Sequence, residues 1–262
     1  MPFFGQRRPS TSSIYATRHG KEVLATREEL QPWAVDDRVV EAMASVDLDV
    51  ILATLEKHRT PEPGWQPSYG RYLNDSRVAH LEAGGFVFEN ISVYMNMVQL
   101  LAPALSGMGA EPPRVLDVGC GTGYLTMVLA HLVVPAGGRV TAIDIFERQV
   151  EHTRRDMEAT RPDLLPHCEF AVANAWEYDS AQRFDAIAVA AQCDKVPENL
   201  VKHLRPGGRL VCPLGPVVPI DCDRADRFNP FWLHEAGPSE GAPPARSERA
   251  GAISVNFLPL LP

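Results

Sequence analysis

Residues Val115 to Tyr124 read Val-Leu-Asp-Val-Gly-Cys-Gly-Thr-Gly-Tyr, so an apolar run is followed by glycines at positions 119, 121 and 123. A glycine turn between a buried strand and a helix lets the backbone approach a ligand closely, because amide N–H groups at the start of the helix point towards it. A dinucleotide-binding loop has the spacing GxGxxG, whereas the third glycine comes one residue earlier here. The stretch therefore predicts a loop that binds a nucleotide-type ligand other than a dinucleotide.

Two carboxylates beside this loop indicate the charge and shape of the ligand. Asp117 lies two residues before the first glycine, where it would repel a pyrophosphate but attract a ligand with a positive amino group and a sulfonium. Asp144 follows Gly123 by 21 residues, at the end of the next apolar run, where a carboxylate can accept both ribose hydroxyls. The loop and the carboxylates together predict S-adenosyl-L-methionine (SAM) as the cofactor. The alternative is a nucleotide-binding fold that has lost its ligand.

Short apolar runs alternate with longer amphipathic segments on both sides of the loop, which predicts a parallel sheet with helices on both faces. The ligand would then lie at the carboxyl ends of the strands. We expect the α/β class, with a doubly wound, mostly parallel seven-stranded Rossmann-like sheet and an N-terminal helical extension. The expected strands are 114–118, 139–144, 168–172, 184–189 and 209–213, and the expected helices between them are 122–133, 146–160 and 196–204.

The two ends of the chain give weaker patterns. A helix is expected after Asp36 or Asp37, where Val39, Val40, Met43 and Val46 recur at helical spacing, and further helices at 50–57 and 92–105. Residues 216–249 are rich in proline, glycine and charge, with 231–234 as a strand candidate, and 254–260 resembles a closing strand. The expected division is a disordered or targeting segment at 1–21, a helical part with substrate-side elements at 22–110, and a SAM-binding α/β domain at 111–262.

Composition narrows the classes of partner. The net charge of −8 over 262 residues disfavours a nucleic-acid groove as the main surface, because such a groove needs a basic face. No apolar run reaches the roughly 18 residues that span a bilayer, so no membrane partner is expected. The five cysteines have no zinc-ligand spacing and are expected to be reduced thiols of an intracellular protein, so no metal site is expected.

The first 21 residues affect the expected location. They carry arginines and serines and no acidic residue, a composition that resembles an organelle transit peptide. Pro2 and Pro9 interrupt the segment and it is poorly amphipathic, which favours a disordered tail. We therefore expect a cytoplasmic protein, with a mitochondrial location as the alternative.

From Arg114 to Gly215 the chain resembles the protein-L-isoaspartate O-methyltransferases, a branch of the class I SAM-dependent methyltransferases. The likeness lies in the glycine loop, in 140–144 (Val-Thr-Ala-Ile-Asp) and in 184–191 (Phe-Asp-Ala-Ile-Ala-Val-Ala-Ala). It continues in 196–200 (Val-Pro-Glu-Asn-Leu) and in 204–215 (Leu-Arg-Pro-Gly-Gly-Arg-Leu-Val-Cys-Pro-Leu-Gly). Residues 37–47 resemble the family's N-terminal helix, and 254–260 its terminal strand.

This resemblance implies roles for individual residues. Asp117, Gly119 and Gly121 would line the methionine end of SAM, and Asp144 and Ile145 would hold the ribose. The family has an Asp-Gly pair that meets the adenine amino group, and Asn174 and Ala175 stand at the matching positions. Asn174 keeps a carbonyl acceptor for that group. The predicted cofactor-binding residues are Asp117, Gly119, Gly121, Gly123, Asp144, Ile145, Asn174 and Ala175.

The substrate motif departs from the family pattern. The family has Gly-Gln-Thr-Ile-Ser-x-Pro ahead of the glycine loop, whereas residues 85–91 here are Gly-Phe-Val-Phe-Glu-Asn-Ile, and Glu89 stands where a hydroxyl should orient the substrate carboxylate. A second carboxylate about 4 Å away would cost several kcal/mol at an effective dielectric near 20. Glu89 then points away, is protonated, or serves an amine or hydroxyl substrate as acceptor or base. Two further readings are that Glu89 is a first-turn helix residue, and that Ser92 supplies the hydroxyl.

Three functions are compatible with these patterns. The first is a SAM-dependent methyltransferase acting on a protein or peptide, related to the isoaspartyl repair enzymes. The second is a catalytically inactive scaffold of the same fold within a larger assembly, suggested by the altered substrate motif. The third is a methyltransferase for a small molecule or RNA, of which RNA is disfavoured by the acidic charge.

Overall fold

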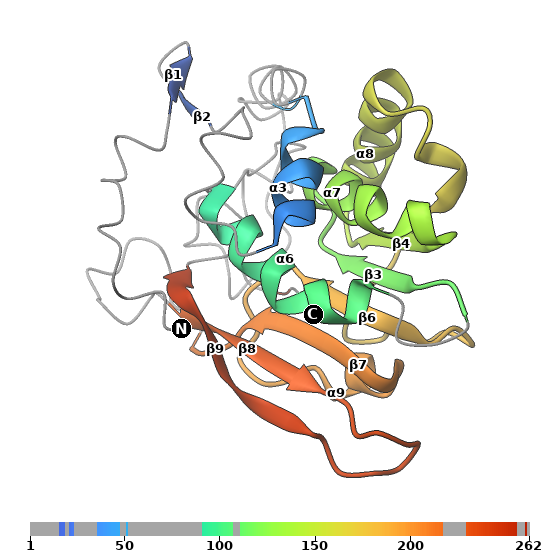
Figure 1. Cartoon of the computed structure of the whole chain (residues 1–262), viewed down its shortest axis with the longest axis vertical. Coiled ribbons are helices and arrows are strands. Elements are labelled where there is room, and N and C mark those ends of the chain that lie inside the picture. Colours follow the sequence, from blue (N-terminus) through green and yellow to red (C-terminus); the bar gives the residue numbers. More distant parts are fainter. Residues whose placement is uncertain are drawn as a thin grey trace, which may run out of the picture.

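The computed structural model describes residues 16–18, 21–23, 36–47, 51, 91–106, 111–216, 229–255 and 260. Their centre is a seven-stranded sheet with the order β5-β4-β3-β6-β7-β8-β9 (Figure 1). The first five of these strands are mutually parallel, and β8 and β9 continue the sheet in an antiparallel manner. The expected mostly parallel α/β sheet is therefore confirmed. The strand bounds are β3 (Arg114–Val118), β4 (Arg139–Asp144), β5 (Cys168–Val172), β6 (Phe184–Val189), β7 (Leu204–Pro213), β8 (Asn229–Glu235) and β9 (Arg246–Val255).

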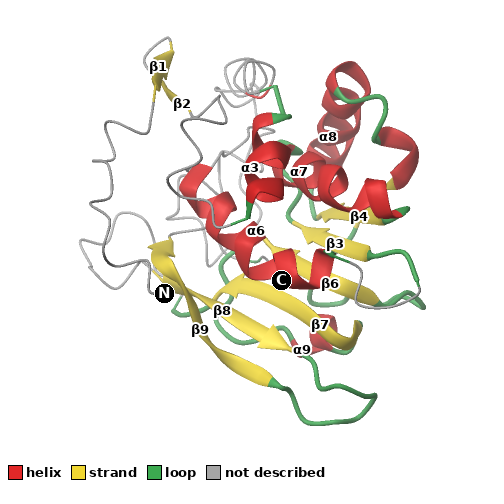
Figure 2. Ribbon diagram, viewed as in Figure 1, coloured by secondary structure: helices red, strands yellow, loops and turns green. Residues whose placement is uncertain are grey.

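Four helices cover one face of the sheet, and one helical turn lies on the other (Figure 2). The covering helices are α3 (Asp37–Ala44), α6 (Ile91–Leu105), α7 (Tyr124–Val133) and α8 (Glu147–Thr160), and the turn is α9 (Glu198–Val201). Short 3-10 turns follow α7 at η2 (Val134–Ala136) and precede β5 at η3 (Leu165–His167). Among the described residues, the predicted cover on both faces is present but uneven.

Burial explains the strand and helix types. Strand β6 is apolar or small at almost every position and is buried along its whole length, as expected of a parallel strand covered on both faces. Helix α8 buries only Gln149, Val150, Thr153 and Met157, which recur at helical spacing, so it is amphipathic and lies on the sheet with its other side in solvent.

Helix α6 packs on the sheet and begins towards the edge at which the parallel strands end. It packs against β6, β7 and β9, and its carboxyl end leads to the start of β3. The Arg209 guanidinium on β7 donates to the Leu100 carbonyl at 3.0 Å and pairs with Glu235 at 2.7 Å. Because α6 ends where the parallel strands begin, its first turn lies towards the edge where they end.

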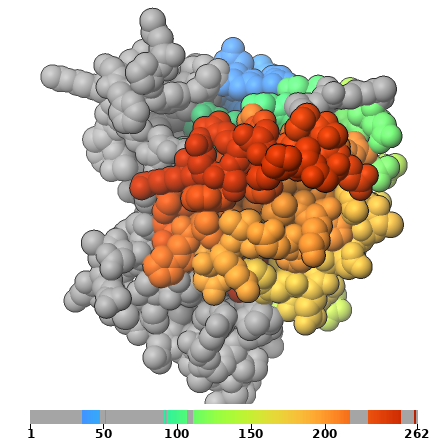
Figure 3. Space-filling model, turned by 90° about the horizontal axis from the view of Figure 1, so that it is seen from below, coloured from blue at the N-terminus to red at the C-terminus, as the bar shows by residue number. Residues whose placement is uncertain are grey.

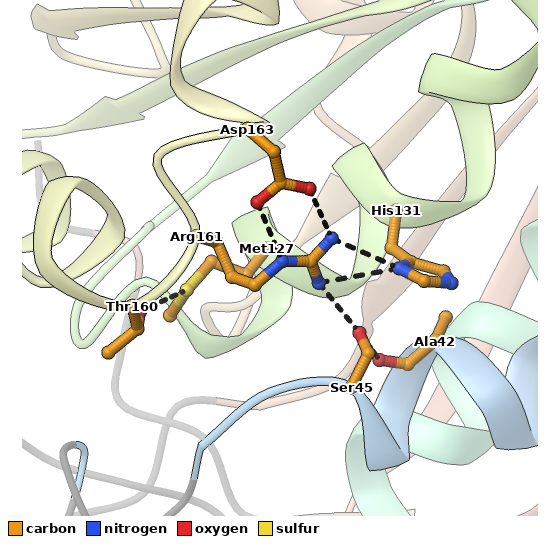
Figure 4. A network of polar contacts seen from close by, with 7 residues as sticks. All are labelled: Ala42, Ser45, Met127, His131, Thr160, Arg161 and Asp163. Atoms are coloured by element: carbon orange, nitrogen blue, oxygen red, sulfur yellow. Dashed lines mark hydrogen bonds and ion pairs between the residues drawn. The ribbon is translucent and has the colours of Figure 1, made fainter.

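Helix α3 is joined to the sheet domain through Arg161, the residue that ends α8 (Figure 4). The Arg161 guanidinium donates to Ser45 Oγ at 2.9 Å and to His131 Nδ1 at 3.3 Å, and it also pairs with Asp163. In turn, Ser45 Oγ donates to the Ala42 carbonyl at the end of α3. One half-buried guanidinium thus links three helices that are distant in the sequence.

Element bounds differ from the expectations in four places. Helix α7 begins at Tyr124, not at residue 122, because Gly123 adopts the left-handed conformation that closes the preceding turn. Helix α9 is only Glu198–Val201, shorter than the predicted 196–204. Strand β7 begins at Leu204, ahead of the predicted 209, and it accommodates the extra residues through a register shift opposite Phe184 and Ala186.

Strand β9 is the largest difference. It runs from Arg246 to Val255, whereas the sequence predicted a closing strand at 254–260; of that range, 254 and 255 lie in β9, Leu260 lies outside any strand, and 256–259 lie outside the described residues. Its charged, glycine-containing sequence carries no strand signal, and pairing with β8 stabilises it instead. Seen from below, the red residues, which include β8 and β9, form a band across the molecule next to the orange residues of β7 (Figure 3). The strand candidate at 231–234 is confirmed within β8.

Near the amino end, two three-residue strands, β1 (Ala16–Arg18) and β2 (Lys21–Val23), pair antiparallel with one another. They fall at the border between the predicted segments 1–21 and 22–110. The helix expected at 50–57 lies outside the described residues except for Ile51, which is helical and fully buried.

Candidate functional site

The glycine loop leaves β3 and turns back against the end of β4. The amides of Gly119 and Cys120 both donate to the Ile143 carbonyl, at 2.9 and 3.1 Å. All three glycines have positive φ, with +83° at Gly119, +51° at Gly121 and +79° at Gly123, which side-chain-bearing residues adopt at a cost. The loop therefore has the conformation that the GxGxG spacing predicted.

Gly123 also has no room for a side chain. A Cβ there would lie 2.8 Å from Thr153 Cγ2 on α8. The Thr153 hydroxyl donates to the Gly121 carbonyl at 3.0 Å, so α8 holds the loop both by contact and by a hydrogen bond. Thr153 was not singled out from the sequence, where a threonine on an amphipathic helix carries no special signal.

Asp144 ends β4 and holds the loop from the other side. Its Oδ2 accepts from the Gly121 amide and its Oδ1 from the Phe146 amide, both at 3.1 Å. Burial raises the pKa of Asp144 to about 6, against the opposing effect of these amide donors. A carboxylate in this setting gains from a ligand that brings further hydrogen-bond donors or positive charge.

Asp117 is fully buried on β3, below the loop. The Thr126 hydroxyl of α7 donates to its Oδ2 at 2.5 Å, while its Oδ1 has no hydrogen-bond partner in the part of the chain that the structure describes. Burial raises its pKa to about 7, with a smaller increase from the charge of Asp144. An unpaired buried carboxylate oxygen is costly, so the site is arranged for a donor that a ligand would bring.

The loop that follows β6 forms a wall of the site. The Ala190 amide donates to the Val118 carbonyl at 2.8 Å, and a Cβ on Gly119 would lie 3.4 Å from the Ala190 carbonyl oxygen. This places the turn at Ala190, which carries part of the family resemblance, directly against the first glycine.

Asn174 and Ala175 lie just beyond β5, next to Asp144. The Ala173 amide donates to the Asp144 carbonyl at 2.9 Å, which fixes the start of this turn. The Asn174 Oδ1 accepts from the Trp176 amide at 2.9 Å, so one of its two lone pairs is used within the turn. Ala175 is buried and its carbonyl accepts from the Asn199 side-chain amide. Ile145, directly after Asp144, is half-buried.

Three residues that sequence reasoning missed lie beside this turn. The Trp176 indole donates to the Leu260 carbonyl at 3.1 Å, and the Leu260 amide donates to the Gln192 carbonyl at 2.8 Å. They are separated by up to 84 positions, and no local pattern marks them.

The structure thus brings all eight predicted cofactor residues to the carboxyl edge of β3, β4 and β5. The two predicted catalytic residues are less defined. Glu89 lies outside the described residues, and Ser92 lies in the first turn of α6 without a described side chain. Both therefore remain predictions from the sequence.

The described residues contain neither a metal-binding cluster nor a membrane-spanning helix. No group of three or more histidine, cysteine or acidic side chains is placed to hold a metal ion there. None of the described helices has the length and apolar character required to cross a bilayer.

Comparison with known proteins assigns the chain to a family. Residues 83–229 match the family model described as protein-L-isoaspartate(D-aspartate) O-methyltransferase (PCMT). A protein-L-isoaspartate O-methyltransferase of Aeropyrum pernix is 38% identical over 121 residues, covering 45% of this chain and 43% of that protein. Protein-L-isoaspartate O-methyltransferase 1 of Arabidopsis thaliana is 30% identical over 153 residues, covering 56% of this chain and 65% of that protein. The chain spans about half the length of the curated relatives it matches.

Solved structures agree on the fold. A structure from Plasmodium falciparum, described as a protein-L-isoaspartate O-methyltransferase in complex with S-adenosyl-L-homocysteine, superposes with a TM-score of 0.63 at 20% identity, covering 89% of this chain and 95% of that one. A second protein-L-isoaspartate O-methyltransferase structure gives a TM-score of 0.57 at 18% identity, covering 89% of this chain and 65% of that one. The family match extends over more than half of the sequence, from the residues before α6 to the start of β8, and the chain belongs to the protein-L-isoaspartate(D-aspartate) O-methyltransferase family.

Proposed function

We propose that the chain binds SAM at the carboxyl edge of β3, β4 and β5 and transfers its methyl group to a carboxylate of a protein or peptide. The observation that carries this proposal is the unpaired, fully buried Oδ1 of Asp117 beneath a glycine loop that is closed by Asp144. The names of the relatives supply the reaction class.

The residues present fit SAM along its whole length. The unpaired Asp117 oxygen suits the positively charged amino group, and the bare backbone at Gly119 and Gly121 allows close approach. Asp144 retains acceptor capacity for ribose hydroxyls, since each carboxylate oxygen has a second lone pair beyond its amide contact. Asn174 and Ala175 stand where the adenine would end.

SAM supplies a methyl group on a sulfonium, which a carboxylate oxygen attacks in line while the C–S bond electrons return to sulfur. A carboxylate is already nucleophilic at neutral pH, so the chain needs to supply alignment and exclusion of water and needs no base. Gly119 lies against Ala190, whose carbonyl oxygen would be 3.4 Å from a Cβ at Gly119, so the loop after β6 is placed beside the methionine end. The buried surroundings of Asp117 keep water from this side of the site.

The identity of the acceptor is the finer part of the proposal. A protein or peptide substrate accords with the family, while Glu89 in the substrate motif predicts weaker binding of an isoaspartyl carboxylate than a hydroxyl would allow. The same Glu89 would favour an amine or hydroxyl acceptor if it faces the substrate. We propose the isoaspartyl peptide as the first substrate to test. Cytoplasmic residence stays a prediction of the composition.

The test has a binding step and a transfer step. Calorimetry with SAM should show one site with a dissociation constant in the micromolar range or below, and no heat at high micromolar ligand would refute the cofactor assignment. Methyl transfer from tritiated SAM is then measured to an isoaspartyl peptide and to the same peptide with ordinary aspartate. Label on the isoaspartyl peptide alone supports the proposal, and Glu89→Ser tests whether the altered motif limits the rate.

The scaffold alternative is tested by the same experiment. It predicts SAM binding without transfer to any offered peptide, together with co-purification in a larger complex. The comparisons give it no support over the methyltransferase. A small-molecule or RNA acceptor would appear as label transferred from tritiated SAM to that acceptor, in a reaction that contains it and no peptide.

A further inference from the structure

Leu260 joins two loops that border the proposed cofactor site. Its amide donates to the Gln192 carbonyl at 2.8 Å, and its carbonyl accepts from the Trp176 indole at 3.1 Å. Trp176 belongs to the turn after β5, and Gln192 to the loop after β6. Leu260 is only 9% exposed, and its hydrogen bond with the half-buried Trp176 is partly shielded from water, which makes it stronger than a bond on the open surface.

On the β5 side, Trp176 connects Leu260 to the proposed adenine contact. Its backbone amide donates to Asn174 Oδ1 at 2.9 Å while its indole donates to Leu260, so both of its N–H groups are used. The Leu260 side chain belongs to the same buried cluster as Ala175. The orientation of the Asn174 side chain and the position of Ala175 therefore depend on where Trp176 is held.

On the β6 side, Gln192 is fixed by its own side chain. Its Nε2 donates to the Gly215 carbonyl at 3.0 Å and to the Cys193 carbonyl at 3.2 Å, which anchors the loop to the end of β7. Ala190, two residues earlier, lies against Gly119. Leu260 consequently connects the turn after β5, on the adenine side of the site, to the loop after β6, which borders the methionine side.

We propose that the hydrogen bonds of Leu260 with Trp176 and Gln192, together called the tie, position the adenine end of the cofactor. Trp176 is the positioning residue. This inference rests on the proposed binding of SAM. The tie holds Asn174 Oδ1 directed at the adenine amino group, and its loss lets the turn at 174–176 move relative to Asp144. Because the tie acts by orienting Asn174, its loss weakens the binding of ligands that carry the adenine amino group more than the binding of ligands that lack it.

The opposing explanation is that Trp176 contributes only packing. Its ring lies in the buried cluster under the sheet, and the Lys195 ammonium lies 5.5 Å from the ring centroid. Trp176→Phe keeps an aromatic ring for both contacts and removes the N–H donor. Trp232 on β8 is a matched control, because it is also half-buried and its indole donates at 3.0 Å to Ser247 Oγ, away from the site.

The experiment measures binding of S-adenosyl-L-homocysteine by calorimetry to the wild type, W176F and W232F. W176F should bind about three- to tenfold more weakly, as expected for one buried hydrogen bond, while W232F binds as the wild type does. The second ligand is S-inosyl-L-homocysteine, whose base carries a 6-oxo group in place of the amino group. For it, the ratio between W176F and wild type should be close to one.

Each outcome decides the inference. Equal affinity of W176F and W232F for S-adenosyl-L-homocysteine overturns the tie and leaves the proposed function intact. An equal loss with both ligands also overturns it, since the loss would then reflect general loosening. No binding by the wild type overturns the tie together with the proposed function.

A backbone variant keeps the inference testable if W176F folds poorly. Leu260→Pro removes the amide donor to Gln192 and keeps the carbonyl that Trp176 contacts, and it should weaken S-adenosyl-L-homocysteine binding by a few-fold. Leu260→Ala retains both backbone hydrogen bonds and should bind within about twofold of the wild type. The reverse order of these two variants would contradict the tie.

Discussion

The carboxylate of Asp144 and the amide of Gly121 lie 23 residues apart in the sequence and are joined by a hydrogen bond of 3.1 Å. The contact brings the end of β4 onto the glycine loop after β3, because the two strands are parallel neighbours that end at the same edge. It also fixes the carboxylate whose position defines the proposed ribose site.

Asp144→Asn should weaken SAM binding by about tenfold or more, because the variant loses the negative charge and one of two acceptor oxygens. The remaining carbonyl oxygen can serve Gly121 or Phe146, and not both. Calorimetry checks the prediction. Asp163→Asn is the matched control, since that side chain is 62% exposed and pairs with Arg161 far from the loop. Equal affinities of the two variants would contradict the assignment of Asp144.

The affinity for SAM should rise with pH between about 5.5 and 7.5. The pKa of Asp117 is raised to about 7 and that of Asp144 to about 6, both mainly by burial, and a cationic ligand binds the ionised carboxyls best. Titration of binding against pH in the wild type and in Asp117→Asn checks this. The variant should bind more weakly and show a flatter profile, whereas an unchanged profile would show that Asp117 does not meet the charged end of SAM.

The ligand-free protein should become less stable as pH rises over the same range. In the unfolded chain the Asp117 carboxyl has its ordinary pKa of 3.8, and burial raises this pKa to about 7 in the folded protein. Between these two pH values the folded state holds a proton that the unfolded state has lost. Unfolding free energy then decreases with rising pH, by about 2 to 4 kcal/mol for this group. Urea unfolding at pH 5 and pH 7.5 measures the decrease, which should be smaller in Asp117→Asn. A variant that retains the full decrease would contradict the buried carboxyl as its cause.

Gly123→Ala should lower stability by about 2 kcal/mol or more, because the new Cβ combines a positive φ with a 2.8 Å approach to Thr153 Cγ2. Gly241→Ala is the control for backbone strain alone, since its φ is +77° and no atom lies within 4 Å of its Cβ position. Denaturant unfolding compares the two. Adding Thr153→Ser removes the clashing methyl while keeping the hydroxyl, and should recover part of the difference, since Thr153 Cα and Cβ still lie 3.2 and 3.3 Å from the new Cβ.

Arg161→Lys should destabilise the attachment of α3 by about 1 to 2 kcal/mol, because one ammonium nitrogen cannot reach all three partners that the separate guanidinium nitrogens contact, namely Ser45, His131 and Asp163. Arg155→Lys on α8 is the control, as its exposed side chain pairs with the exposed Glu151 on the same helix at 3.4 Å. Chemical unfolding and limited proteolysis near residue 47 measure the loss. Equal stability of the two variants would mean that Arg161 does not hold α3.

The sequence predicted the sheet and most of its cofactor edge because these follow from patterns that are local in the chain. Alternation of apolar runs and amphipathic segments identified β3 to β6, and the GxGxG spacing required the positive φ values now seen at 119, 121 and 123. Asp144 could be placed because parallel strands end at a common edge. The resemblance carried by the same residues led to the family that the comparisons show.

Only the tertiary structure shows which contacts hold the predicted helices, strands and loops together. The contacts of Leu260 with Trp176 and Gln192, of Arg161 with Ser45, and of Gly123 with Thr153 join residues that are far apart in the sequence. Strand β9 likewise exists because β8 offers an edge to pair with. Such contacts depend on strand order and on the packing of one helix against another, and neither quantity is encoded by the periodicity or propensity of any single segment.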